Sequence, residues 1–272
     1  MTRPITEAEV TSFWSEGVVV LRGILPTNWL AGLDEAVEHA IGSGETANLG
    51  PIAGDSSTSS PGFFAGVDHW KTSTAFSALA FDSPVVPIVA SLLRSRHLWL
   101  WEDSLLVKEP GAPFETKFHS DDGYFHVSGE QVCTVWIPLD PAGPHNGALR
   151  WVRGSHNEGV SYRPNLFVTD EPLPHTVGSV VPEVEGSPEF ADRMVSYDLE
   201  PGDITVHHAR TLHGAPANAS TSRRRAVSIR YCGDDARYCI KPGLSVREGL
   251  DASLDGHPVG PPICPAVLSA TS

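Results

Sequence analysis

The sequence predicts a mainly β protein of the α+β kind, a β-sandwich or jelly roll with helices packed on its outside. Helical patterns are confined to the N-terminal part, whereas short apolar or alternating segments separated by turn clusters fill the middle of the chain. The chain has 272 residues, 40% of them hydrophobic, enough for a sizeable core in one domain. We expect a single domain over 1–272, with a helical part at about 1–98, a jelly-roll core at about 99–243 and a wrapping C-terminal tail.

The N-terminal part opens with a helix signal. Thr6 and Glu9 fit a capping box, Ile5 and Val10 fit a hydrophobic staple, and Gly17 ends the pattern. Further elements are expected as a short buried strand at 18–21 and helices at about 27–41 and 85–93.

Short strands are expected in the middle of the chain, at 99–107, 133–139, 149–153, 204–208 and 226–231. Two long stretches lack periodicity. Residues 42–62 are rich in Gly, Ser, Thr and Pro and form either a mobile lid or a poorly ordered loop. Residues 158–198 resemble a long insertion between strands. Both stretches are candidate walls of a substrate pocket.

Composition excludes several classes of partner. A formal net charge of -14 disfavours nucleic acid and anionic membranes. The four cysteines match neither a zinc-site spacing nor a small disulfide scaffold. The N-terminus has no apolar core of a signal peptide, and no apolar run approaches a membrane span. We therefore expect a cytoplasmic monomer or homodimer that acts on a small-molecule substrate.

A candidate metal site lies in the segment 118–124. His119 and Asp121 are two residues apart, so both side chains leave the same face of an extended segment. An imidazole and a carboxylate that converge on one point suit a divalent metal such as Fe(II). His213 would complete a facial triad and leave three octahedral positions open for a co-substrate and dioxygen.

The same residues have other interpretations. His119 and Asp121 could belong to a surface turn in which an aspartate caps a backbone amide. His207 and His208 compete with His213 as ligands, although adjacent residues in a strand point in opposite directions.

Several further segments occur in a recognisable order between Trp99 and about Gly243. They are His119-Ser120-Asp121-Asp122-Gly123-Tyr124, Asn146-Gly147-Ala148-Leu149, Gly154-Ser155-His156, Gly202-Asp203, His213-Gly214, Asn218, and Arg224 at eleven residues past His213. In this order they resemble the phytanoyl-CoA dioxygenase family of Fe(II)- and 2-oxoglutarate-dependent oxygenases. The resemblance implies a cupin-like double-stranded β-helix.

The resemblance also implies the roles of individual residues. His119, Asp121 and His213 would hold the iron, and Arg224 would pair with the distal carboxylate of 2-oxoglutarate, which suits a guanidinium fork. The strand pattern leaves Arg225 as the alternative. Arg225 shares its face of the strand with the apolar residues, and by hydrophobicity that face should be the buried one. We favour Arg224, since a jelly roll with a polar cavity can direct its apolar face to an outer layer.

Other residues are weaker candidates. Trp136 matches a family position near the co-substrate, and Lys108 or Lys117 could make a second contact to the carboxylate of 2-oxoglutarate. The candidates for the substrate pocket are Tyr124, His126 and Arg230. Trp136, Tyr124 and His126 could instead be packed in the core, either lysine could be solvated, and Arg230 could contact a buried acid.

The function that the resemblance implies is oxidation of an unactivated C–H bond, with release of succinate and carbon dioxide from 2-oxoglutarate and dioxygen. Asp121 favours hydroxylation over halogenation, because related halogenases have a small residue there. Desaturation, cyclisation and a non-catalytic cupin-like binding protein remain alternatives. A zinc hydrolase is disfavoured, because the sequence lacks the common hydrolase motifs. The acidic chain also gives no reason to expect a coenzyme A ester as the substrate.

Overall fold

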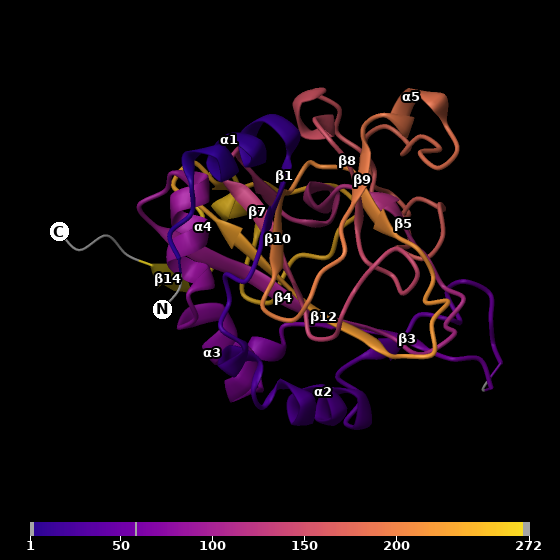
Figure 1. Cartoon of the computed structure of the whole chain (residues 1–272). Coiled ribbons are helices and arrows are strands. Elements are labelled where there is room, and N and C mark those ends of the chain that lie inside the picture. The colour runs from indigo at the N-terminus through magenta and orange to yellow at the C-terminus, as the bar shows by residue number, and fades with distance from the viewer. Residues whose placement is uncertain (1–2, 58, 269–272) are drawn as a thin grey trace.

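Two antiparallel sheets pack against each other, and helices cover the outer face of the larger one (Figure 1). The computed structural model describes residues 3–57 and 59–268. The larger sheet has the order β1-β10-β7-β12-β4-β3-β2, with β14 also paired to β4. The smaller sheet has the order β5-β11-β8-β9, and β13 pairs with β6. This arrangement confirms the mainly β prediction.

The strands and helices have the following bounds. The strands are β1 (Val18–Leu21), β2 (Ala47–Asn48), β3 (Phe63–Val67), β4 (Leu98–Lys108), β5 (Thr116–His119), β6 (Val127–Ser128), β7 (Val132–Pro138), β8 (Arg150–Val152), β9 (Met194–Ser196), β10 (Ile204–His208), β11 (His213–Ala215), β12 (Arg224–Cys232), β13 (Arg237–Tyr238) and β14 (Ala266–Leu268). The α-helices are α1 (Glu7–Glu16), α2 (Leu33–Gly42), α3 (Thr74–Phe81), α4 (Val85–Leu93) and α5 (Pro188–Ala191).

Helix α1 begins and ends where the sequence predicts. The Thr6 side chain accepts the backbone N–H of Glu9, and the Glu9 carboxylate accepts the backbone N–H of Thr6 at 2.7 Å. Gly17 closes the helix at φ 78°, a conformation that glycine adopts without steric cost. A Cβ at Gly17 would also lie 2.4 Å from the side chains of His156 and Thr211. The chain can therefore turn directly into β1.

The predicted helix over 27–41 is wrong in its first part. Residues Thr27–Leu30 form a separate 3₁₀ turn, and α2 starts only at Leu33. Gly32 caps α2 at φ 82°, a left-handed conformation that interrupts the continuous helix. The hydrophobic spacing was real, but it belongs to two short elements.

The segment Thr74–Leu93, which contains α3 and α4, is long and apolar enough by composition alone to cross a membrane. The expectation that no apolar run approaches this length is therefore wrong. Of its most apolar 18-residue window, 61% is buried inside the structure, and many of its side chains belong to the core between the helices and the larger sheet. This burial explains its composition. The sequence predicted α4 but not α3.

The larger sheet separates two environments. On β12, Val227, Ile229 and Tyr231 point into the apolar core beneath the helices. Arg224 and Arg230, on the opposite face, line a cavity between the two sheets. Figure 1 shows α1, α3 and α4 on one side of the molecule, and α5 with the smaller sheet on the other. The alternation along β12 therefore has the orientation that we favoured.

The five strands expected in the middle of the chain are present within one or two residues. The strands that the sequence did not reveal are all of five residues or fewer, namely β2, β3, β5, β6, β9, β11, β13 and β14. Residues 42–62 contain β2, and residue 58 lies outside the described residues. Residues 158–198 contain α5 and β9.

Candidate metal centre

The smaller sheet and the turn after β5 bring three candidate ligands together. His119 ends β5, His213 begins β11, and the two residues are direct cross-strand partners. Asp121 starts a short 3₁₀ turn immediately after β5. One ligand atom from each of the three residues lies within 4.8 Å of the other two, and all three residues are buried. Local strand pairing therefore produces the predicted triad.

Backbone contacts orient both imidazoles toward the centre. The Nδ1 atom of His119 lies 2.7 Å from the carbonyl oxygen of Lys117, and Nδ1 of His213 lies 2.9 Å from that of Thr211. Because a carbonyl only accepts hydrogen bonds, each Nδ1 carries the proton and each Nε2 presents a lone pair. Burial lowers the pKa of His119 to about 3 and that of His213 to about 4, so both rings are neutral at neutral pH.

Asp121 is held as a carboxylate. Burial alone would raise its pKa, but the positive charge of Arg230 and the neighbouring imidazoles outweigh burial and hold the pKa well below its usual range. Its Oδ1 lies 3.8 Å from Nε2 of His119 and 3.9 Å from Nε2 of His213. Oδ1 is therefore the ligand atom of this carboxylate.

The other carboxylate oxygen is anchored by two residues of the larger sheet. Oδ2 accepts a hydrogen bond of 2.5 Å from Oγ1 of Thr134 and lies 3.2 Å from Nε2 of His207. Thr134 and His207 are paired across β7 and β10. Sequence reasoning did not identify this support. His207 was considered only as a rival ligand, and Thr134 has no motif.

The predicted ambiguity among the histidines is resolved by strand geometry. His207 points into the cavity, with its ring centroid 4.3 Å from that of His213. His208 points the other way, and its Nε2 lies 2.9 Å from the carbonyl oxygen of Glu130. His207 therefore accompanies the triad, while His208 takes no part in it.

Arg224 lines the triad cavity, and Lys108, which does not line it, lies beside Arg224 on the adjacent strand. They are cross-strand partners on β12 and β4. Arg224 is only 2% exposed, and burial lowers its pKa to about 10, so it stays cationic. Lys108 donates from Nζ to the carbonyl oxygen of Pro216 at 2.6 Å, and burial, followed by the charge of Arg224, lowers its pKa.

Two donors in this region have no partner among the described residues. They are Nε of Arg224 and Nε1 of Trp136, both buried. The guanidinium also lies over the Trp136 ring, 5.8 Å from its centroid. A buried cation with an unsatisfied donor is costly unless an anion joins it. By contrast, Arg225 lies on the other face and pairs with Asp140 and Asp34.

The remaining predicted residues have varied positions. The Tyr124 ring packs edge-on against His119 at 5.5 Å. Arg230 lines the cavity, donates to Oγ of Ser104 at 2.5 Å, and lies 3.7 Å from Glu102.

His126 does not line the cavity. It lies among segments of the C-terminal part of the chain, where Nδ1 accepts the backbone N–H of Lys241 at 3.0 Å. Its closeness in sequence to the ligands was misleading, because the chain leaves the cavity after the turn at 121–124. Lys117 does not line the cavity either, and it forms an ion pair with Glu115.

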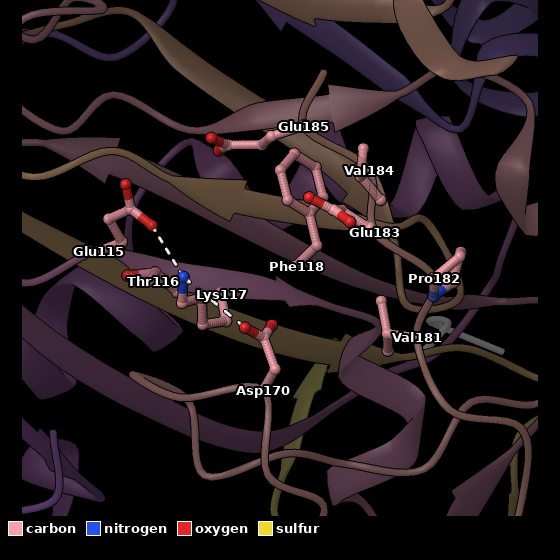
Figure 2. A pocket seen from close by; sticks show the side chains of 10 residues that line it. All are labelled: Glu115, Thr116, Lys117, Phe118, Asp170, Val181, Pro182, Glu183, Val184 and Glu185. Atoms are coloured by element: carbon pink, nitrogen blue, oxygen red, sulfur yellow. Dashed lines mark hydrogen bonds and ion pairs between the residues drawn. The ribbon is translucent and has the colours of Figure 1, made fainter. Parts of the chain in front are cut away.

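Two concave spaces adjoin β5. The cavity at the triad has a volume of only about 20 Å³. A groove of about 410 Å³ shares Thr116 with it, and we call this the β5 groove. Figure 2 shows Lys117 of this groove between Glu115 and Asp170. The residues that line it are Glu115, Thr116, Lys117, Phe118, Asp170, Val181, Pro182, Glu183, Val184 and Glu185.

The residues present fit iron(II) and 2-oxoglutarate. Two neutral imidazoles and one carboxylate form the facial ligand set of non-haem iron oxygenases. The unsatisfied guanidinium of Arg224 suits the free carboxylate of a dicarboxylic acid. His119, Asp121 and His213 would hold the metal, and Arg224 would hold the far end of the co-substrate.

Comparison with known sequences agrees with this chemistry. The chain is 29% identical over 163 residues to a probable alpha-ketoglutarate-dependent hypophosphite dioxygenase of Stutzerimonas stutzeri, covering 60% of this chain and 54% of that protein. It is 30% identical over 112 residues to the 1-deoxypentalenic acid 11-beta-hydroxylase of Streptomyces exfoliatus, covering 40% and 37%. The matches therefore span about half the length of the curated relatives, or less.

Solved structures share the fold. The alpha-ketoglutarate-dependent carbocyclase SnoK from nogalamycin biosynthesis matches with a TM-score of 0.73 and 21% identity, covering 96% of each chain. The epimerase SnoN, solved with Fe3+, alpha-ketoglutarate and nogalamycin RO, matches with a TM-score of 0.73 and 24% identity over 96% of this chain and 98% of SnoN. The fold is thus that of alpha-ketoglutarate-dependent enzymes.

The sequence pattern of the family described as Phytanoyl-CoA dioxygenase (PhyH) matches residues 13–226. This range is well over half of the chain and contains the three candidate ligands and Arg224. The chain therefore belongs to the phytanoyl-CoA dioxygenase family.

Proposed function

We propose that this protein is an Fe(II)- and 2-oxoglutarate-dependent oxygenase that hydroxylates an unactivated C–H bond of a small organic metabolite. The observation that carries the proposal is the cavity between the sheets. It combines a buried His119–Asp121–His213 cluster with the cation of Arg224, whose Nε lacks a partner among the described residues. A metal-storage or sensing protein would need the ligands but not this buried cation.

The residues around the metal position act before any oxidation. The two backbone carbonyls keep His119 and His213 in the tautomer that presents Nε2 to the metal. Thr134 and His207 hold one oxygen of Asp121 and leave the other for the metal. When bound, iron(II) with 2-oxoglutarate and dioxygen supplies the oxidant, and the co-substrate becomes succinate and carbon dioxide.

The residues at the other end of the cavity orient the co-substrate. Arg224 offers a fork of donors to the distal carboxylate, and Lys108, its cross-strand neighbour, is a candidate for a second contact to it. Trp136 closes one wall and offers its free indole N–H. Because these groups are buried, water is excluded from them, and the attraction between the Arg224 guanidinium and the distal carboxylate is stronger than it would be in water.

We propose a small organic substrate that is not a coenzyme A ester. The β5 groove beside the metal cavity carries four carboxylates, from Glu115, Asp170, Glu183 and Glu185, against the single amine of Lys117. A polyanionic nucleotide thioester would be repelled there. The formal net charge of -14 also disfavours a polyanionic ligand.

Succinate release across a metabolite panel tests the proposal. The protein is loaded with Fe(II) and 2-oxoglutarate, oxygen is added, and succinate is measured with each candidate substrate. We expect one or more small metabolites to raise succinate release in parallel with formation of a hydroxylated product. Asp121→Ala should abolish both signals. Equal succinate release by Asp121→Ala and the unmodified protein would contradict the assignment.

A further inference from the structure

We propose that Phe167 controls access to the metal position and thereby selects substrates by size, an inference that rests on the proposed function. Phe167 lies in the insertion 158–198 and lines the cavity of the triad. Its ring centroid is 5.2 Å from that of His119. With Phe167 in this position the cavity has a volume of only about 20 Å³, so the ring restricts the space left for a co-substrate and a substrate beside the metal position.

The backbone at Phe167 is strained. Its φ is 69°, a left-handed value that is unusual for a bulky aromatic residue. The N–H of Val168 donates to the carbonyl oxygen of Leu166 at 2.8 Å, which closes a three-residue γ-turn around Phe167. γ-Turns with positive φ are rare and strained. Such a conformation persists only where neighbouring contacts enforce it, and it is often found in segments that switch.

The contacts that enforce it come from Asn165. Its side-chain oxygen accepts the N–H of Phe167 at 2.9 Å, and its amide donates to the carbonyl oxygen of Phe118 at 2.9 Å. The hydroxyl of Tyr124 donates to the side-chain oxygen of Asn165 at 2.7 Å. The buried Asn165 therefore anchors the segment and directs the Phe167 ring toward the metal ligand His119.

Beyond Asn165, the segment is a small hairpin. Leu166 donates to the carbonyl oxygen of Glu171 at 2.9 Å, so residues 166–171 form the hairpin tip. The tip meets β5 through the N–H of Lys117, which donates to the carbonyl oxygen of Phe167, and through an ion pair of 3.7 Å between Lys117 and the 79% exposed Asp170. Exposed ion pairs contribute little, so the main resistance to movement of the tip is the apolar packing of Phe167 and Val168.

The two spaces beside β5 explain the direction of this movement. Phe167 fills the triad cavity, whereas Asp170 of the same tip lines the β5 groove. Displacement of the tip would move the Phe167 ring away from His119. The triad cavity would then be continuous with the β5 groove of about 410 Å³. A bound substrate would then contact the apolar cluster that Phe167 joins, which contains Phe63, Leu106, Ala112, Phe114 and Val168. The geometry therefore favours a substrate with an apolar portion next to the oxidised carbon.

Hydrogen exchange tests the mobility of the hairpin without depending on the proposed function. In metal-free protein, we expect amides of 164–173 to exchange at least about tenfold faster than amides of β12, because local opening of the tip exposes them. Exchange of the hairpin as slow as that of β12 would overturn the proposal, because a tip that opens only with the core cannot admit ligands.

Association kinetics test the gating. The rate of 2-oxoglutarate binding to the anaerobic Fe(II) protein is measured for the unmodified protein, Phe167→Ala and Phe114→Ala. Phe114 belongs to the same apolar cluster but does not line the cavity, so it controls for lost packing. We expect association to be at least about fivefold faster for Phe167→Ala and unchanged for Phe114→Ala, since the apparent rate follows the open fraction.

The outcomes separate the two proposals. Equal association rates for all three proteins would overturn the role of Phe167 while leaving the oxygenase assignment intact. Absence of any Fe(II)–2-oxoglutarate complex in the unmodified protein would contradict the proposed function, and the exchange experiment would still decide whether the hairpin opens. In the panel assay, Phe167→Ala should accept bulkier substrates than the unmodified protein, and an identical substrate range would contradict size selection.

Discussion

At the scale of single residues, the site depends on groups whose charge is unmatched until ligands bind. Arg224 is the clearest case, because it is buried and cationic and its Nε has no partner among the described residues. Replacing Arg224 by Gln should weaken 2-oxoglutarate binding roughly 30-fold or more, since truncating one partner of a buried charge pair costs about 2 kcal/mol or more. The dissociation constant is measured by anaerobic titration of the Fe(II) protein.

A neighbouring arginine provides the matched control. Arg225 has the same charge but pairs with Asp140 and Asp34 on the opposite face of β12. Arg225→Gln should leave 2-oxoglutarate affinity nearly unchanged. A larger loss for Arg225→Gln than for Arg224→Gln would reverse the assignment.

Support of the metal ligand is also a property of individual residues. Thr134→Val removes the hydroxyl that donates to Oδ2 of Asp121 while keeping the shape of the side chain. We expect metal affinity to fall by about 10–100-fold, the usual effect of losing a hydrogen bond that orients a ligand. Competition with a chromophoric chelator for Co(II) measures this without turnover, and unchanged affinity would show that Asp121 needs no such support.

At the scale of elements, β4 carries a buried acid away from the metal. Asp103 is 1% exposed, and neither of its carboxylate oxygens has a hydrogen-bond partner among the described residues. Burial raises its pKa from the usual 3.8 to about 7. Between about pH 4 and 7 the folded protein therefore binds more protons here than the unfolded chain, and the stability of the fold falls as pH rises.

Asp103→Asn should remove this pH dependence. The variant should gain stability relative to the unmodified protein as pH rises from about 4 to 7, with an upper limit of about 4 kcal/mol. Urea unfolding at pH 5 and pH 8 measures the two differences. If the stability difference between the proteins is the same at both pH values, Asp103 is not the titrating group.

Elements also show what the sequence could reveal. The order of short motifs that includes His119, Asp121, His213 and Arg224 made these four residues predictable by resemblance, whereas the pairing of β5 with β11 that joins the two histidines was not predicted. The interruption of the predicted helix at Gly32 could not be predicted, because the hydrophobic spacing continues from one side of Gly32 to the other. Phe167 and Thr134 were also missed, since an aromatic residue in an aperiodic loop and a threonine in a strand acquire roles only through tertiary contacts.

At the scale of the whole molecule, the helices and the larger sheet share one core. Side chains of α1, α3 and α4 pack in the same cluster as strands β4, β7, β10 and β12. We therefore propose that the chain is a single domain and expect one cooperative thermal transition, with calorimetric and van't Hoff enthalpies in agreement. Two separate transitions, one for residues 1–98 and one for the sheets, would contradict this.

The central claim is that one cavity holds iron(II) and 2-oxoglutarate together. Anaerobic addition of Fe(II) and 2-oxoglutarate should produce a weak visible charge-transfer band in the unmodified protein and none in Asp121→Ala, while circular dichroism shows both proteins folded. Absence of the band in folded, unmodified protein, or its persistence in Asp121→Ala, would contradict the claim.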